Sequence, residues 1–126
     1  MRWFSRKTPE DIWDQPVAGT LGDIEAAERI RVICQAANSS AEIAGGAPAS
    51  ARRRKRESER YERAARTAME IAMKISDDLM RDDAIRRIVD LCMTANDMKT
   101  AQILYRAVQA AWIREVLQKD YPALAQ

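Results

Sequence analysis

Apolar residues recur at three- and four-residue intervals along four stretches of the chain, which is the spacing of one face of an α-helix. The last stretch is apolar around most of its circumference, as is typical of a helix with neighbours on two sides. The pattern predicts an all-α fold of four main helices packed as antiparallel hairpins. The predicted helices cover residues 21–38, 58–75, 78–95 and 97–119.

Capping residues mark where these helices begin and end. Ser76 and Asp77 precede the third helix, and Asn96 and Asp97 separate the third from the fourth. Asn suits the residue after a helix, whereas Ser and Asp accept hydrogen bonds from the first free N–H groups of one. The run of Asn and Ser at 38–40 is expected to end the first helix.

Composition divides the chain into five segments. A lead segment, 1–20, contains one short helical turn and precedes the first helix, 21–38. Residues 39–56 join a Gly/Ala-rich stretch to a basic run, and we expect a flexible linker there. Residues 57–121 are expected to form a three-helix core, and 122–126 a tail.

The lead segment carries large aromatic side chains, Trp3, Phe4 and Trp13, beside several cations. One interpretation is that these aromatics dock on the protein's own core. Another is that they anchor the chain to a partner. Contact with a membrane surface is the least favoured, because the segment is short.

The helical stretches also repeat one another. Residues 68–75, with the pattern A-x-x-I-A-x-x-I, recur 33 residues later at 101–108 as A-x-x-L-Y-x-x-V. Residues 30–38 match 88–96 through I-x-x-(I/L)-C-x-x-A-N. The first predicted helix therefore resembles the third, and the second resembles the fourth. The Gly/Ala stretch and the basic run are inserted after the first helix.

This period of paired helices resembles the tetratricopeptide-like class of helical repeats over residues 24–38 and 61–117. The Trp-Leu-Gly-Tyr pattern of that class is absent, and the insertion between 38 and 61 interrupts a regular stack. The resemblance implies a concave surface that binds a peptide or helix of another protein. It implies no catalysis.

Charge is concentrated although the net charge is only +2. Residues 52–66 hold eight basic and three acidic side chains. Such a run can bind nucleic-acid phosphates, meet an acidic protein or lipid headgroup, or remain solvated. The candidate contact residues are Arg52, Arg53, Arg54, Lys55, Arg56, Arg60 and Arg63.

Five of the six methionines fall within a 30-residue window that begins at Met69. Methionine fills irregular cores and also forms adaptable binding surfaces. Because Met69 and Met73 lie beside the main apolar face of their helix, we expect them to line a partner groove. Tyr105 and Trp112 complete that predicted groove.

The sequence lacks the residues and motifs that several classes of chemistry require. Histidine is absent, and no phosphate-loop, dinucleotide or zinc motif occurs. Cys34 and Cys92 lie in apolar helical patterns and are interpreted as small buried side chains. The acids near Asp78 can hold a cation, but they equally suit a helix start. We therefore expect no enzyme, no cofactor and no metal.

No apolar run approaches the length of about 20 residues that spans a bilayer, and the basic start has no apolar core after it. A cytoplasmic location is expected. The leading hypothesis is a non-enzymatic interaction or assembly protein. It would bind a partner, or itself as a homo-oligomer, through exposed apolar helix faces, with the basic segment steering an acidic surface. The alternative is a small helical nucleic-acid-binding regulator that uses residues 52–56.

Overall fold

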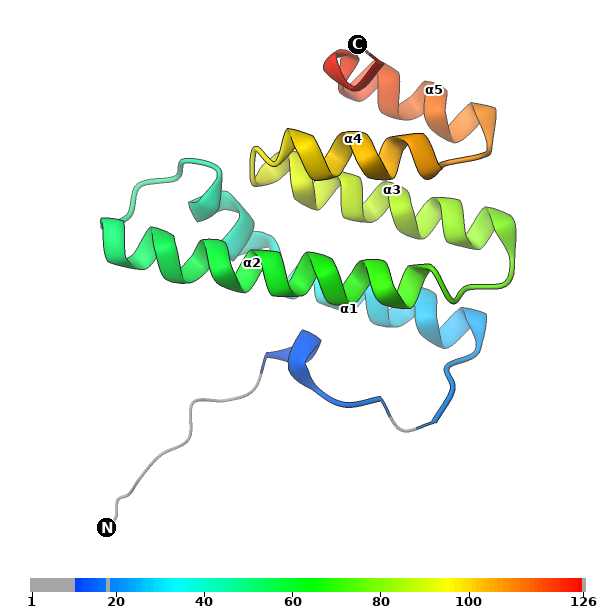
Figure 1. Ribbon diagram of the computed structural model, residues 1–126, viewed down its shortest axis with the longest axis horizontal. Coiled ribbons are helices and arrows are strands. Elements are labelled where there is room, and N and C mark those ends of the chain that lie inside the picture. Colours follow the sequence, from blue (N-terminus) through cyan, green and yellow to red (C-terminus); the bar gives the residue numbers. More distant parts are fainter. Residues whose placement is uncertain (1–10, 18, 126) are drawn as a thin grey trace.

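The computed structural model describes residues 11–17 and 19–125 of the chain. No strand occurs in these residues, so the all-α prediction is confirmed. None of the helices within this part is long and apolar enough to cross a membrane. The elements are the 3-10 helix η1 (Ile12–Asp14), α1 (Asp23–Ala44), α2 (Ala51–Ala72), α3 (Asp78–Thr94), α4 (Met98–Ala107), α5 (Ala111–Asp120) and the 3-10 helix η2 (Pro122–Ala125) (Figure 1).

The helices pack as two antiparallel hairpins, α1 with α2 and α3 with α4 (Figure 1). The helix α3 is central, because it contacts α1, α2, α4 and α5. At the start of α1, the Asp23 carboxylate accepts hydrogen bonds from the backbone N–H groups of Ser76 and Asp77, both at 2.9 Å. At its end, Gly45 lies against the backbone of Thr94. The two helices therefore run parallel and in contact along their length.

The core lies between α1, α2 and α3. Ile30 and Ile33 of α1 and Ile85 and Ile88 of α3 are almost completely buried, and burying each such side chain stabilises the fold by about 1.5–3 kcal/mol. The helix α2 contributes mainly small residues, which let its backbone approach its neighbours closely. Its buried alanines are Ala64, Ala65, Ala68 and Ala72.

The prediction of a flexible linker over 39–56 is wrong at both ends of that range. The helix α1 continues to Ala44, because Ala41 and Ile43 extend its buried face and Ser40 is itself buried. The Ser40 hydroxyl donates to the Glu57 carboxylate of α2, with an O–O distance of 2.7 Å. The helix α2 begins at Ala51, and Ser50 caps it. Only residues 45–50 connect the two helices, and the basic run forms the first turns of α2.

Two hairpin turns end their first helix in the same way. Gly46 after α1 and Asn96 after α3 both have positive φ angles, of 124° and 58°. In each turn the next N–H group bonds back to the carbonyl five residues earlier, which is the pattern of a Schellman cap. The predicted stop at Asn96 and start at Asp97 are confirmed, since the Asp97 side chain accepts from the Thr100 N–H. The predicted stop at residues 38–40 is wrong.

The single helix expected over 97–119 is broken at residues 108–110. Asp82 of α3 is 1% exposed, and one of its oxygens accepts hydrogen bonds from the N–H groups of Gln109 (3.0 Å) and Ala110 (2.7 Å). This carboxylate satisfies donors at the start of α5, where negative charge is stabilised. Residues 57–121 therefore hold most of α2 and three further helices, in place of a three-helix core.

The 33-residue repeat agrees with the burial of the side chains. Ala68 and Ala101 are fully buried, and Ile75 and Val108 are nearly so. The register continues past these residues, because α3 begins at Asp78 and α5 begins 33 residues later. The break between α4 and α5 is thus the repeat of the break between α2 and α3.

Candidate interaction surfaces

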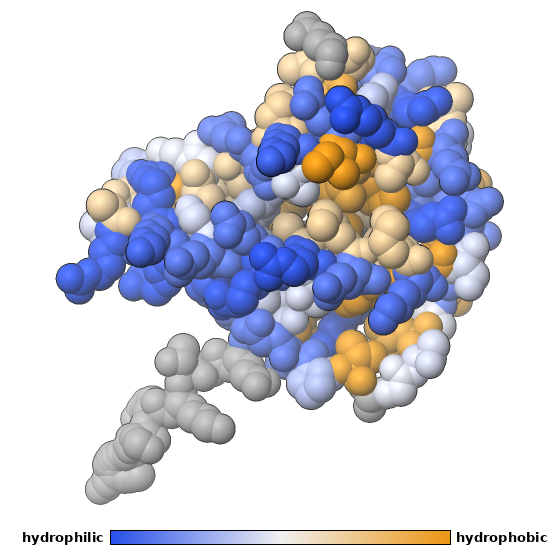
Figure 2. Space-filling model, viewed as in Figure 1, coloured by the Kyte–Doolittle hydropathy of each residue, from blue (hydrophilic) through white to orange (hydrophobic). Residues whose placement is uncertain are grey.

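We use the word channel for the strip of surface between α2 and α4. Both helices pack on α3, but they make little contact with each other. Figure 2, in the view of Figure 1, shows apolar side chains gathered between these two helices, with hydrophilic side chains on either side. This arrangement leaves apolar surface of two neighbouring helices exposed to solvent.

The channel deepens where α4 begins. A depression of about 300 Å³ there is lined by α2 and by the start of α4. Its lining residues are Tyr61, Glu62, Ala65, Arg66, Met69, Asp97 and Thr100. The Tyr61 hydroxyl donates to the Asp97 carboxylate, with an O–O distance of 2.7 Å. Burial, followed by the neighbouring Cys92 and Asp97, raises the pKa of Tyr61. The phenol is therefore a fixed neutral donor that ties the start of α4 to α2.

The four predicted groove residues do not share one lining. Met69 lines the depression, and Met73 at the end of α2 is 54% exposed. Tyr105 is partly buried against the core, and its hydroxyl accepts from the Gln118 amide of α5. Trp112 is exposed on α5.

Sequence reasoning missed one residue of this surface. Ile103 of α4 is 57% exposed and follows Thr100 by three residues, so the two lie on one side of the helix. When 97–119 is taken as one helix, apolar residues cover most of its circumference, so the pattern did not single out Ile103 as exposed.

The basic run forms the tip of the α1–α2 hairpin. Arg52, Arg53, Lys55 and Arg56 are exposed to solvent. Arg54 differs, because its guanidinium folds back on the end of α1 and donates to the carbonyls of Ile43 and Ala47, the latter at 3.0 Å. Four of the five cations are therefore available to a ligand, and the fifth holds the hairpin together.

The other two predicted basic contacts bind the protein's own lead segment. The Arg60 guanidinium donates to the Asp11 carboxylate and to Glu57, and it lies 5.4 Å from the centre of the Trp13 ring. The Asp11 hydrogen bond is the main cause that raises the pKa of Arg60. Arg63 lies 3.6 Å from the Asp11 carboxylate.

These contacts place η1 on the outside of α2. Trp13 is only 3% exposed and belongs to the core, so docking on the protein's own core is the correct interpretation for this residue. Trp3 and Phe4 lie outside the described residues.

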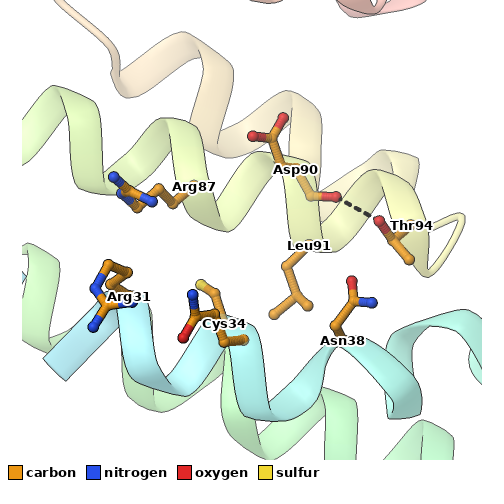
Figure 3. A pocket seen from close by; sticks show the side chains of 8 residues that line it. Arg31, Cys34, Asn38, Arg87, Asp90, Leu91 and Thr94 are labelled. Atoms are coloured by element: carbon orange, nitrogen blue, oxygen red, sulfur yellow. Dashed lines mark hydrogen bonds between the residues drawn. The ribbon is translucent and has the colours of Figure 1, made fainter. Parts of the chain in front are cut away.

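A second depression, of about 380 Å³, lies between α1 and α3 (Figure 3). Arg31 and Arg87 line it from opposite helices. Each has a carboxylate partner on its own helix, Glu28 for Arg31 and Asp83 for Arg87. Its remaining lining residues are Cys34, Gln35, Asn38, Asp90, Leu91 and Thr94.

The acid in this depression is tied to the end of the chain. The Tyr121 hydroxyl donates to the Asp90 carboxylate at 2.9 Å. Burial raises the pKa of Asp90, and this hydrogen bond opposes the rise. Asp90 thus serves to hold the segment after α5 against α3.

Both cysteines are free thiols. Burial raises the pKa of Cys34 to about 12 and that of Cys92 to about 11. Such thiols stay protonated at neutral pH and are poor nucleophiles. Among the described residues, no group of three or more acidic or cysteine side chains is placed to hold a metal ion.

The comparisons with family models, curated proteins and solved structures gave no match. The function of this chain is therefore inferred from its own surfaces.

Proposed function

We propose that this chain is a non-enzymatic interaction module that binds a segment of another protein in the channel between α2 and α4. The observation that carries the proposal is the exposed apolar surface shared by two helices that do not close on each other. Met73 and Ile103 are each more than half exposed. Met69 and Tyr61 line the depression at the start of α4. Removing such surface from water contributes about 25 cal/mol per Å².

A short helical-repeat architecture supports this role. The two hairpins stack through α1 and α3, and α5 packs against α3. The 33-residue register relates α2 and α3 to α4 and α5. We propose that these are two stacked hairpin repeats closed by a final helix, a class that binds partners through extended grooves.

The expected occupant is an amphipathic segment that carries acidic residues beside its apolar ones. Arg66 lines the depression and is exposed. Lys99 and Arg106 are exposed on α4 and flank Ile103 at helical spacing. These cations attract acidic residues of a partner toward α4, whereas Glu62 and Asp97 line the depression and repel such residues there. A second copy of this chain would bring the same cations to the interface. The cytoplasmic location remains a prediction.

Affinity capture from the native host with matched variants tests this proposal. The double variant Met73→Glu, Ile103→Glu places two acids in the channel at exposed positions, so the fold is expected to survive. The control, Ile24→Glu with Leu79→Glu, changes two other exposed apolar residues of α1 and α3, which are 76% and 52% exposed. We expect the channel variant to capture at least tenfold less of the partner protein than the wild type does. The control should capture as much as the wild type.

A circular dichroism spectrum of each variant checks that the helices persist. Equal loss in both variants, or equal retention, contradicts a site in the channel. Capture of only the same chain contradicts the proposed class of occupant.

A further inference from the structure

The tip of the α1–α2 hairpin extends past the turn between α3 and α4 (Figure 1). Gly45 packs against the end of α3, so residues 46–56 lie beyond that helix. Within 43–56 there are five cationic side chains and no carboxylate. The exposed Glu42 borders this span on α1, so the tip is a projecting and predominantly positive surface.

The cations at this tip have few partners within the protein. Among the described residues, no carboxylate lies within ion-pairing distance of Arg52, Arg53 or Lys55. Arg56 lies 3.7 Å from Glu57 but remains 59% exposed. The Glu57 carboxylate is already bound by Ser40 and Arg60. Four exposed cations are thus free to contact an external anion.

The position of these cations is unfavourable to the helix itself. The start of α2 carries the positive end of the helix dipole, where each nearby cation costs about 0.3–1 kcal/mol. The first turn of α2 holds no acid that would offset this cost. A feature that opposes local stability in this way is expected at a functional surface.

The tip also lacks the side chains that anchor a protein partner. Between 44 and 56 there is no aromatic or large aliphatic residue, whereas the centre of a protein interface is apolar and depleted of charge. Aromatic residues for stacking on bases are equally absent. What the tip offers is positive charge alone, which is the requirement for binding phosphates of a nucleic-acid backbone.

We propose that the exposed tip residues Arg52, Arg53, Lys55 and Arg56 bind the phosphate backbone of double-stranded nucleic acid without regard to its sequence. This activity is separate from the channel between α2 and α4. Along α2 the nearest residues of the two surfaces, Arg56 and Tyr61, are about 7.5 Å apart, and Arg52 and Met69 are about 25 Å apart, from the rise of 1.5 Å per residue. The protein then holds a nucleic acid at the tip and a protein segment in the channel.

Fluorescence anisotropy with labelled DNA duplexes of about 20 base pairs and two unrelated sequences tests the proposal. Four phosphate contacts predict a slope of log K against log salt of up to about −3.6. The affinity should fall on the order of 100-fold between about 50 and 200 mM salt, equally for both duplexes. Changing all four tip residues to Gln should abolish binding.

The matched control changes four exposed cations outside both proposed surfaces, Lys74, Arg87, Arg114 and Lys119, to Gln. It removes the same charge and should retain most of the affinity. No duplex binding by the wild-type chain at about 50 mM salt overturns the proposal, as does equal loss in both variants.

Two further probes separate the sources of anionic charge. Phosphatidylserine vesicles and polyglutamate are offered to the wild-type chain under the same conditions. Weaker binding to both than to the duplex supports the assignment. Binding to vesicles or to polyglutamate as tight as to the duplex overturns it in favour of a membrane or an acidic protein.

Discussion

Asp82 is a buried carboxylate that joins two helices. One of its oxygens accepts from the backbone N–H groups of Gln109 and Ala110, while the other has no hydrogen-bond partner among the described residues. A buried charge of this kind is tolerated because it meets free donors at a helix start. The single side chain thereby fixes where α4 ends and α5 begins.

Replacing Asp82 with Ala leaves the partly buried N–H groups of Gln109 and Ala110 without their acceptor. We expect the free energy of unfolding to fall by about 2–4 kcal/mol, measured by urea denaturation. Asp82→Asn keeps an acceptor oxygen and should lose clearly less. A variant Asp82→Ala as stable as the wild type would contradict this capping role.

Glu57 gives the fold a dependence on pH. The hydrogen bond from Ser40, aided by Arg60, lowers its pKa below the ordinary value of 4.5. A lowered pKa means that the folded chain binds this proton less readily than the unfolded chain does. The stability contributed by Glu57 is therefore present above pH 4.5 and is lost as the pH falls through the folded pKa.

Urea denaturation near neutral pH and near pH 3 measures this effect. Glu57→Gln should be less stable than the wild type near neutral pH, and the difference between them should shrink on acidification. The other carboxylates titrate in both proteins, so this difference reports Glu57. A difference that stays constant, or grows in acid, would show that the Ser40 contact does not favour the ionised carboxylate.

At the scale of the element, local sequence determines which segments become helices but not where they stop. The Asn96 and Asp97 boundary was predictable because Asn96 adopts the positive φ angle that ends α3, and because Asp97 caps α4 through the nearby Thr100 N–H. Ser40 was misjudged as a stop because its partner, Glu57, lies 17 residues away. The break before α5 depends on Asp82, which lies 27 residues before Gln109.

The 33-residue repeat in the sequence did indicate where the break before α5 lies. Shifting the Ser76 and Asp77 break by 33 residues places it at Gln109 and Ala110, where α4 ends and α5 begins. Candidate site residues were less predictable. Met69 could be found from its position beside the apolar face of α2, whereas Ile103 sits on a helix with apolar residues on every side.

The contact between α1 and α3 depends on a residue without a side chain. A Cβ atom on Gly45 would lie 2.1 Å from the Thr94 carbonyl oxygen, which belongs to the backbone and cannot move freely. We expect Gly45→Ala to lower the midpoint of thermal unfolding by several degrees, since a clash of this kind costs about 1–3 kcal/mol.

Gly22→Ala provides the matched control. There the added Cβ meets only the flexible end of the Glu25 side chain. Calorimetry should find this variant close to the wild type. If Gly45→Ala unfolds at the same temperature as Gly22→Ala, the close packing at the end of α1 is not present in solution.

At the scale of the whole molecule, the two proposed surfaces lie apart on α2. The basic tip occupies the first turns, and the depression toward α4 is lined from Tyr61 to Met69. Neither surface contributes a buried contact to the other, so substitutions in one should leave the other unchanged. The core formed by α1, α2 and α3 keeps both in fixed positions on one rigid hairpin.

Site-specific photo-crosslinking in the native host tests the channel most directly. A photoreactive amino acid replaces Ile103 in one variant and the exposed Glu42 of α1 in another. We predict one cross-linked protein species from position 103, joined through a segment that contains apolar and acidic residues, and no such species from position 42. Cross-links from position 42 alone, from neither position, or only to a second copy of the chain would contradict binding of a partner between α2 and α4.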